Sequence, residues 1–345
     1  MKLKKYMFLL MLTLLVAVLT ACVEKDSASP AEGSEASASG EGESRTFKIT
    51  HVVQESHVWH TTAEKFGEEL SKLSNGRLNV EIYPASQLGA EADMVQQIET
   101  GAIDFGFITN AYMSTREDSL NAWFMPYLFS NLEEAVAMRE SEEAKQMLDT
   151  LSSQGLLGLD FAFAGNRHVL MKDGFAESPS DLKGKKIRII GSPAMQSYWE
   201  KVGAGPTAMP LTEVYTSLQT GVIDGIDIDL DALVTEKYYE NAKYLTLTNQ
   251  MTFPTVVVMS QQVYDQLSPE DQEIVKQAMK TAVDWGAQEA IKREAENLET
   301  LKAAGVEVLE EIDTAPFQSV TDEVRTEFSN KSDIIKSFIE TAESK

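Results

Sequence analysis

Arg188 is the side chain of this sequence best suited to bind an anion. It lies in segment 186–190, which has the pattern of a strand, and Gly191-Ser192-Pro193 then turns the chain into a helix. Ligands of open α/β folds bind at the carboxyl ends of strands. A guanidinium pairs with a carboxylate through two parallel hydrogen bonds, as a lysine cannot. The alternative is an edge-strand arginine that pairs with a surface acid.

Two other charged residues are candidates for the same site. Arg167 lies at an expected boundary between two lobes, as a second cationic contact to a ligand or as part of an ion pair in a hinge. Asp227 belongs to a run in which acids alternate with apolar residues, a pattern that favours one solvated face. Asp227 is nevertheless placed to approach a ligand. Asn110 and His57 complete the polar candidates for ligand binding.

The sequence lacks the motifs of metal sites and of common catalytic centres. An EF-hand register that starts at Asp227 puts Ala232 at the required glycine and Tyr238 at the required glutamate, so no calcium loop is expected. His57 and His60 do not form a His-Glu-x-x-His pattern, which argues against catalytic zinc. There is no nucleophile elbow, P-loop or Gly-x-Gly-x-x-Gly motif. We therefore expect a binding protein, not an enzyme, with no metal and no cofactor.

Two segments of the chain, 120 residues apart, have nearly the same sequence. Residues 98–104 read IETGAID and residues 218–224 read LQTGVID. In each, an apolar-periodic helix ends at a glycine, where a left-handed residue is favoured, and a strand follows. This punctuation is common enough to arise by chance, but four identities in seven residues favour two similar α/β lobes.

Alternating strand and helix patterns place the candidate residues in two such lobes. A chain of 345 residues is too long for one ordinary core. We expect residues 46–164 with 255–293 to form lobe I, and residues 165–254 with 294–345 to form lobe II. A helix of about 36 residues that begins after Ser268 would be about 54 Å long, enough to span both lobes. The strands expected are 47–53, 78–82, 102–108, 155–163, 186–190, 207–209, 225–228 and 252–259.

The N-terminus has the pattern of an export signal. A basic start precedes the apolar run 7–19, which is shorter than the ~20 residues that a membrane span needs. The sequence LTAC at 19–22 is similar to a bacterial lipobox, so residues 1–21 are predicted to be a signal peptide and Cys22 to carry a lipid. Residues 22–45, rich in Ser, Glu, Gly and Ala, are predicted to form a flexible tether.

The charge of the chain limits its partners. The formal net charge is −24, which opposes binding to nucleic acid. Such a surface also repels small anions, so an anionic ligand needs a local cationic anchor.

The folded part resembles a known family, the DctP-type solute-binding proteins of TRAP (tripartite ATP-independent periplasmic) transporters. The resemblance covers most of Phe47 to about Ala304. It is densest in 181–188 (DLKGKKIR), 203–207 (GAGPT) and 213–225 (EVYTSLQTGVIDG). In the first lobe it extends to the motifs SQLG (86–89) and PYLF (126–129).

The resemblance implies a two-lobed periplasmic-binding-protein-like α/β fold with crossing strands and a long helix. It also implies that the two lobes close over one ligand and that Arg188 binds the carboxylate of this ligand. It places Arg167 where many members have a second polar contact, and Leu211 where an aromatic residue often packs on the ligand. Ile228 replaces a frequent asparagine that binds the carboxylate. This departure makes a monocarboxylate (a keto, hydroxy or sugar acid) at least as good a candidate as sialic acid or a C4-dicarboxylate.

The expected function is an extracytoplasmic receptor that delivers a small organic acid to a TRAP-type membrane permease. The lipid at Cys22 would hold it on the outer face of the cell membrane of a Gram-positive host, or in the periplasm of a Gram-negative one. Two alternatives stay open. The chain could present its ligand to a membrane-bound sensor kinase, or it could be a lipoprotein enzyme that uses acids such as Asp227.

Overall fold

The computed structural model describes residues 43–345. The predicted signal peptide, the lipidation site Cys22 and nearly all of the predicted tether lie outside these residues. Arg45, predicted as the last tether residue, is the first residue of strand β1. Among the helices that the structure describes, none combines the length and apolar character needed to cross a bilayer.

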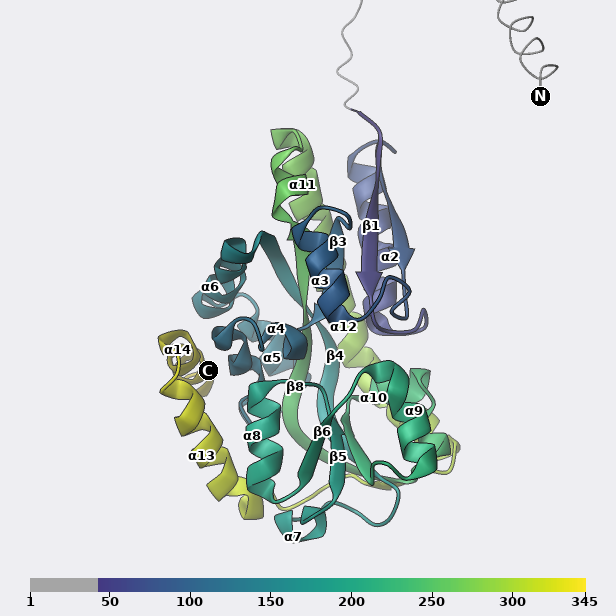
Figure 1. Ribbon diagram of the computed structural model, residues 1–345, viewed down its shortest axis with the longest axis vertical. Coiled ribbons are helices and arrows are strands. Elements are labelled where there is room, and N and C mark those ends of the chain that lie inside the picture. Colours follow the sequence, from purple (N-terminus) through teal and green to yellow (C-terminus); the bar gives the residue numbers. More distant parts are fainter. Residues whose placement is uncertain (1–42) are drawn as a thin grey trace, which may run out of the picture. The chain divides into compact units, whose positions relative to one another are not determined.

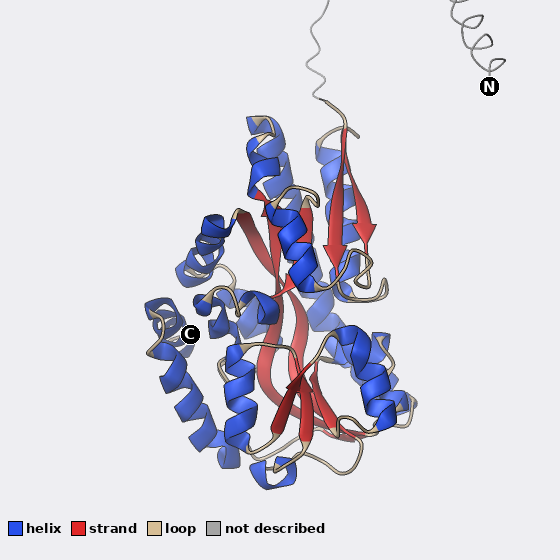
Figure 2. Cartoon of the chain, in the orientation of Figure 1, coloured by secondary structure: helices blue, strands red, loops and turns tan. Residues whose placement is uncertain are grey.

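Nine strands form one mixed sheet that runs through the whole folded part (Figures 1 and 2). Eight of them lie in the order β2-β1-β3-β8-β4-β7-β5-β6, and β9 pairs with β8. The strands are β1 (Arg45–His51), β2 (Leu78–Tyr83), β3 (Phe105–Thr109), β4 (Leu156–Met171), β5 (Lys186–Ile189), β6 (Gly205–Ala208), β7 (Gly225–Ile228), β8 (Tyr244–Ser260) and β9 (Glu307–Leu309).

The strand order has the same pattern of parallel and antiparallel pairs when it is followed inwards from either edge of the sheet. In lobe I, β1 pairs in parallel with β2 and β3, and β3 pairs antiparallel with β8. In lobe II, β5 pairs in parallel with β6 and β7, and β7 pairs antiparallel with β4. The order thus equates β2 with β6, β1 with β5, β3 with β7 and β8 with β4. The expected two-lobed α/β fold with crossing strands is confirmed.

The two copies of the sequence repeat occupy equivalent places. Gly101 and Gly221 end their helices in the left-handed region, with φ of 72° and 75°. The side chain of Asp104 accepts a hydrogen bond from the Lys48 N–H at 2.8 Å, and that of Asp224 accepts one from the Lys186 N–H at the same distance. Each aspartate therefore joins the end of its repeat to the first strand of its lobe. The two copies of the repeat are similar in structure as well as in sequence.

Helices cover both faces of the sheet (Figure 2). α2 follows β1 as α8 follows β5, and α3 precedes β3 as α9 precedes β7. The helices are α2 (Val58–Leu73), α3 (Glu91–Glu99), α4 (Asn110–Met113), α5 (Leu132–Met138), α6 (Glu142–Thr150), α7 (Pro179–Leu182), α8 (Pro193–Val202), α9 (Leu211–Thr220), α10 (Leu230–Thr235), α11 (Gln261–Asp265), α12 (Pro269–Ala303), α13 (Gln318–Ser329) and α14 (Asp333–Glu343), with 3₁₀ helices η1 (Asp118–Phe124), η2 (Leu151–Gln154), η3 (Tyr238–Glu240) and η4 (Ala315–Phe317).

Three long elements run from one lobe into the other: β4, β8 and α12. All three predicted lobe boundaries fall inside them, because β4 continues to Met171 and β8 begins at Tyr244. β4 changes register between Phe163 and Gly165, and Gly165 has φ of 146°. α12 begins at Pro269 and is capped by Ser268 as expected, and its 35 residues confirm the long helix.

The C-terminal end does not follow the predicted division into lobes. α14 lies within the range predicted for lobe II, yet Phe338 packs edge-on against Trp123 of η1 at 4.8 Å between ring centroids. Ser337 and Thr341 donate hydrogen bonds to Glu143 of α6, which belongs to the range predicted for lobe I. The chain thus returns to lobe I at its end.

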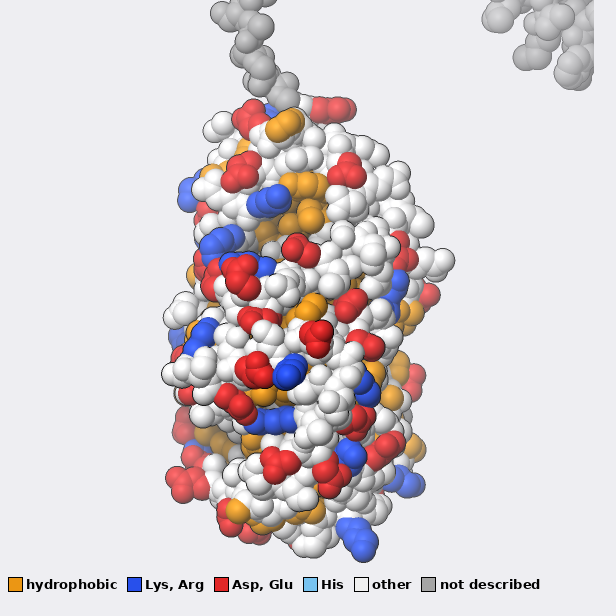
Figure 3. Space-filling view, turned by 90° about the vertical axis from the view of Figure 1, so that its left-hand side faces the viewer, with side chains coloured by type: hydrophobic (Ala, Val, Ile, Leu, Met, Phe, Trp, Pro, Cys, Tyr) orange, Lys and Arg blue, Asp and Glu red, His pale blue; other side chains and the backbone are white. Residues whose placement is uncertain are grey.

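The surface charge is mixed on a local scale. On the face shown in Figure 3, Lys and Arg side chains are interspersed with Asp and Glu and do not form a continuous basic area.

Candidate functional site

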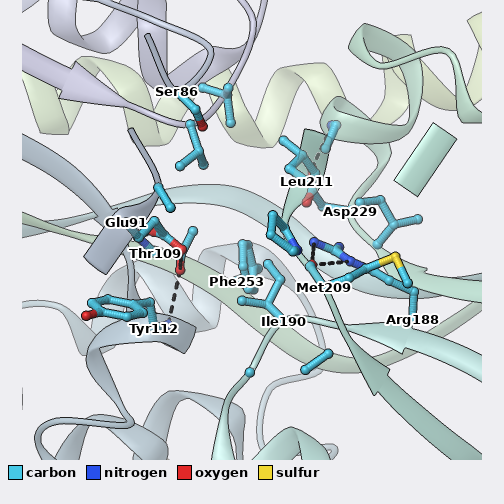
Figure 4. Close-up of a pocket in the computed structure, with 18 of the residues that line it drawn as sticks. Ser86, Glu91, Thr109, Tyr112, Arg188, Ile190, Met209, Leu211, Asp229 and Phe253 are labelled. Atoms are coloured by element: carbon cyan, nitrogen blue, oxygen red, sulfur yellow. Dashed lines mark hydrogen bonds between the residues drawn. The ribbon is translucent and has the colours of Figure 1, made fainter. Parts of the chain in front are cut away.

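A cavity of about 310 Å³ lies between the lobes at the carboxyl ends of the parallel strands (Figure 4). Lobe I contributes residues that directly follow β1 and β2 and the last residue of β3; lobe II contributes residues at or just after the ends of β5, β6 and β7. Such a crevice is where open α/β sheets bind ligands. The lining includes Val52, Val53, His57, Trp59, Ser86, Ala90, Glu91, Thr109, Tyr112, Arg167, Arg188, Ile190, Met209, Leu211, Ile228, Asp229 and Phe253.

Arg188 is a buried cation that no carboxylate of residues 43–345 neutralises through a salt bridge. Its strand β5 lies between β7 and β6, so the edge-strand alternative is wrong. The side chain is 1% exposed; Nε and Nη2 donate to the Met209 carbonyl at 3.2 and 3.0 Å, and Nη1 has no partner among the described residues. Burial lowers the pKa of Arg188 to about 10, which still leaves it charged at neutral pH. Buried charges in proteins are normally paired, so this guanidinium is well placed to pair with an anion that enters the cavity.

Arg167 differs from Arg188 because its charge is already matched. Its Nε and Nη2 donate to the carboxylate and the carbonyl of Asp227, and its Nη1 donates to Asp229 at 3.0 Å. The guanidinium also lies 4.2 Å from the ring centroid of Phe253. Of the two alternatives for Arg167, the ion pair near the lobe boundary is thus present, and the residue also lines the cavity.

The alternating acids of β7 and α10 are buried, contrary to the solvated face that their pattern favours. Asp227 and Asp229 are 0% and 1% exposed. The pKa of Asp229 is lowered to about 2, because the neighbouring His57 and Arg167 side chains outweigh its burial. Asp227 also accepts a hydrogen bond from Trp199 Nε1 at 2.8 Å. The prediction of a solvated face is wrong because helices cover both faces of the sheet here. The buried Arg167 pairs with the charges of the two aspartates.

Glu91 is a cavity residue that the sequence reasoning missed. It is the first residue of α3 and lies across the cavity from Arg188 (Figure 4). Its two oxygens accept hydrogen bonds from the N–H and the hydroxyl of Thr109, at 2.7 and 3.0 Å. Burial raises the pKa of Glu91 to about 7, although Thr109 and Arg188 oppose this. The 120-residue repeat could have pointed to Glu91. Glu91 lies 120 residues before the candidate Leu211, so it holds the equivalent position in lobe I.

The other sequence candidates separate into two groups. His57, Leu211 and Ile228 line the cavity. His57 caps α2, and its Nε2 lies 3.7 Å from Asp231 and 3.9 Å from Asp229. Asn110 does not line the cavity: its amide donates to the Leu120 carbonyl at 2.8 Å. Asp227 does not line it either and contacts the cavity only through Arg167.

The walls of the cavity are mostly apolar apart from these charged and polar groups. Trp59 and Phe253 stack with their ring centroids 5.9 Å apart, and Ile190 and Met209 lie on the side of lobe II. Across the part of the chain that the structure describes, no three His, Cys, Asp or Glu side chains are grouped as a metal ion requires. The arrangement suits a small organic anion with an apolar face.

Comparison with known proteins gives a consistent result. The profile of the family described as bacterial extracellular solute-binding protein, family 7 (DctP), matches residues 49–332. The 2,3-diketo-L-gulonate-binding periplasmic protein of Escherichia coli K12 is 27% identical over 79% of this chain and 83% of its own. A TRAP periplasmic solute-binding protein of Xanthobacter autotrophicus Py2 with bound β-D-galacturonate superposes with a TM-score of 0.81 at 30% identity, covering 86% of this chain and 99% of that one. One from a Bradyrhizobium species, in complex with D-galacturonate, gives 0.83 at 28% identity over 87% and 100%.

Proposed function

Because this chain belongs to family 7 of the bacterial extracellular solute-binding proteins, we propose that it captures a small hydroxylated monocarboxylate outside the cytoplasm and delivers it to TRAP-type membrane permease subunits. Arg188 clamps the carboxylate. Cys22 carries the lipid that holds the protein at the membrane, in keeping with the lipobox-like sequence before it.

The observation that carries this proposal is the guanidinium of Arg188, which lines the cavity between the lobes and has no carboxylate partner among the described residues. A ligand carboxylate supplies the missing charge and gives Nη1 an acceptor. Exclusion of water strengthens this pair relative to a pair at the surface. Binding therefore selects the closed arrangement of the two lobes, which is the state that a permease can distinguish from the open one.

The charges around the cavity favour a monocarboxylate over a dicarboxylate. Arg167 is matched by Asp227 and Asp229, which leaves Arg188 as the cation available among the described residues. A second ligand carboxylate would have to face Glu91 or Asp229. Hydroxyl groups, in contrast, can donate to Glu91 and pack against Tyr112 and Ser86. The galacturonate bound by the two structural relatives has this chemistry.

A thermal-shift screen tests the proposed ligand class. We expect D-galacturonate or D-galactonate at about 100 times its dissociation constant to stabilise the protein by about 2.7 kcal/mol. Succinate, which has a second carboxylate and no hydroxyl, is expected to give a much smaller shift at the same concentration. Stabilisation by succinate alone would contradict the assignment to a hydroxylated monocarboxylate.

Affinity for such a ligand is expected to fall as the pH rises through 7. Below this pH the Glu91 carboxyl is protonated and can donate a hydrogen bond to the ligand; above it, the ionised carboxylate repels the ligand anion. Anion binding raises the pKa of Glu91 further, so binding takes up a proton. We expect the Kd from calorimetry to rise by up to about tenfold per pH unit above pH ~7. In Glu91→Gln this dependence is expected to disappear; an unchanged profile would assign it to another group.

A further inference from the structure

Asp231 of lobe II holds the first turn of α2 in lobe I. Its Oδ2 accepts a hydrogen bond from the N–H of Val58, the first residue of α2, at 2.7 Å. Its Oδ1 accepts one from Asn297 of α12 at 2.9 Å and lies 3.5 Å from Nη1 of Arg293. The carboxylate is 3% exposed. A negative charge at a helix N-terminus is favourable, and the more so where water is excluded.

The contact lies on the cavity side of the molecule. His57 and Trp59, the two residues next to Val58, both line the cavity. Trp59 N–H donates to His57 Nδ1 at 3.1 Å, so in the neutral ring the proton is on Nε2, which faces Asp229 and Asp231. Arg293 also donates to the Ser56 carbonyl at 2.8 Å and fixes the chain just before α2.

Asp231 and α2 belong to different lobes. The lobes are joined covalently by β4, β8 and α12 and by the C-terminal segment that returns to lobe I at α14, none of which joins α2 directly to α10, so α2 can separate from α10 when the cleft opens. Opening on the cavity side exposes both Asp231 and the N-terminus of α2 to water. Closing brings them together again and, at the same time, brings His57 and Trp59 to the ligand.

We propose that Asp231 is a positioning residue that latches the cleft closed by capping α2 across the lobe boundary, and thereby slows ligand release. This inference rests on the proposed binding function. The latch stabilises the closed form, which must open before a bound ligand can leave, so it acts mainly on dissociation and changes association little. It differs in kind from Arg188, which contacts the ligand itself.

Stopped-flow tryptophan fluorescence with D-galacturonate as the probe tests the latch. Asp231→Ala is expected to raise the dissociation rate about tenfold or more and to change the association rate by less than about twofold. Asp231→Asn keeps an oxygen that can accept from Val58 N–H and is expected to restore most of the slow release. Asp271→Ala is the matched control, because Asp271 is also buried and pairs with Arg77 at 2.7 Å, away from the cavity. Equal dissociation rates in Asp231→Ala and Asp271→Ala overturn the latch, as does an effect confined to association.

A second measurement needs no ligand and separates the two proposals. Cys22 is the only cysteine, so the full chain with Cys22→Ser can be spin-labelled at cysteines introduced in place of the exposed residues Gln262 and Val222, one on each lobe. We expect Asp231→Ala to shift the distance distribution towards open forms. If D-galacturonate does not bind the wild type but this shift is seen, the ligand class fails and the latch stands. Identical distributions overturn the latch whatever the ligand.

Discussion

Arg188→Ala is expected to reduce affinity for the cognate acid by about 30-fold to a few thousandfold, which abolishes binding at ordinary ligand concentrations. Truncation of one partner of a buried, hydrogen-bonded charge pair costs about 2–5 kcal/mol, and each 1.4 kcal/mol is about tenfold. Isothermal titration calorimetry with the best ligand of the screen measures the effect. Arg188→Lys is expected to bind with intermediate affinity, because it keeps a charge but loses the planar fork.

The stability of Arg188→Ala without ligand serves as the control for folding. Arg188 is buried and lacks an anionic partner in the ligand-free protein, so its removal relieves a desolvation cost. The midpoint of thermal unfolding without ligand is therefore expected to stay the same or to rise slightly. Arg188→Met, which keeps most of the volume, is the matched variant for the space left by alanine. Wild-type affinity in either variant would contradict the carboxylate clamp.

Asp227→Ala is expected to lower the free energy of unfolding by about 3–5 kcal/mol, the cost of removing one partner from a buried ion-pair network. Arg167 keeps Asp229 but loses its second carboxylate partner, and Trp199 Nε1 and Gln250 Nε2 lose the oxygen to which they donate. Urea denaturation followed by circular dichroism measures the loss. Asp227→Asn keeps an acceptor and is expected to lose less.

A triple variant distinguishes ion-pair stability from ligand contact. Arg167→Met combined with Asp227→Leu and Asp229→Asn removes all three charges of the network, and replacement of buried ion pairs by uncharged residues is often neutral. We expect the triple variant to recover most of the stability that Asp227→Ala loses. If Asp227→Ala is stable but fails to bind ligand, Asp227 acts on the ligand instead. The sequence analysis left this role open for Asp227.

The fold was predictable to the extent that it depends on local patterns. The glycine-ended repeat at 98–104 and 218–224 correctly indicated two similar lobes, since helix ends and buried strands leave local signals. The long strands were underestimated: β4 was expected to end at Phe163, because Gly165 and the polar residues after it interrupt the apolar run. These residues stay in the strand because β8 continues beside them through a register shift, a partner that the sequence does not reveal.

The site was predictable only where one residue carries the chemistry by itself. Arg188 was predicted because it lies near the carboxyl end of a short strand, just before a Gly-Ser-Pro turn, where open α/β folds bind ligands, and the structure places it in the cavity lining. Asp227 and Asp229 appeared to be surface acids because their match, Arg167, comes from a strand about 60 residues earlier in the chain. Glu91 has an ordinary position at the start of a helix, and only the facing wall of the other lobe turns that position into part of a cavity.

The sheet order also determines which lobe can be completed first during folding. The four-strand unit β6-β5-β7-β4 of lobe II is made from residues 165–228, one continuous stretch of chain. Its counterpart in lobe I lacks β8 until residues 255–259 arrive to pair with β3. Because distant contacts close slowly, lobe I begins first along the chain but is finished last. We therefore expect the β1-β2-β3 unit to stay open to proteases until β8 pairs with β3, which limited proteolysis during refolding can test.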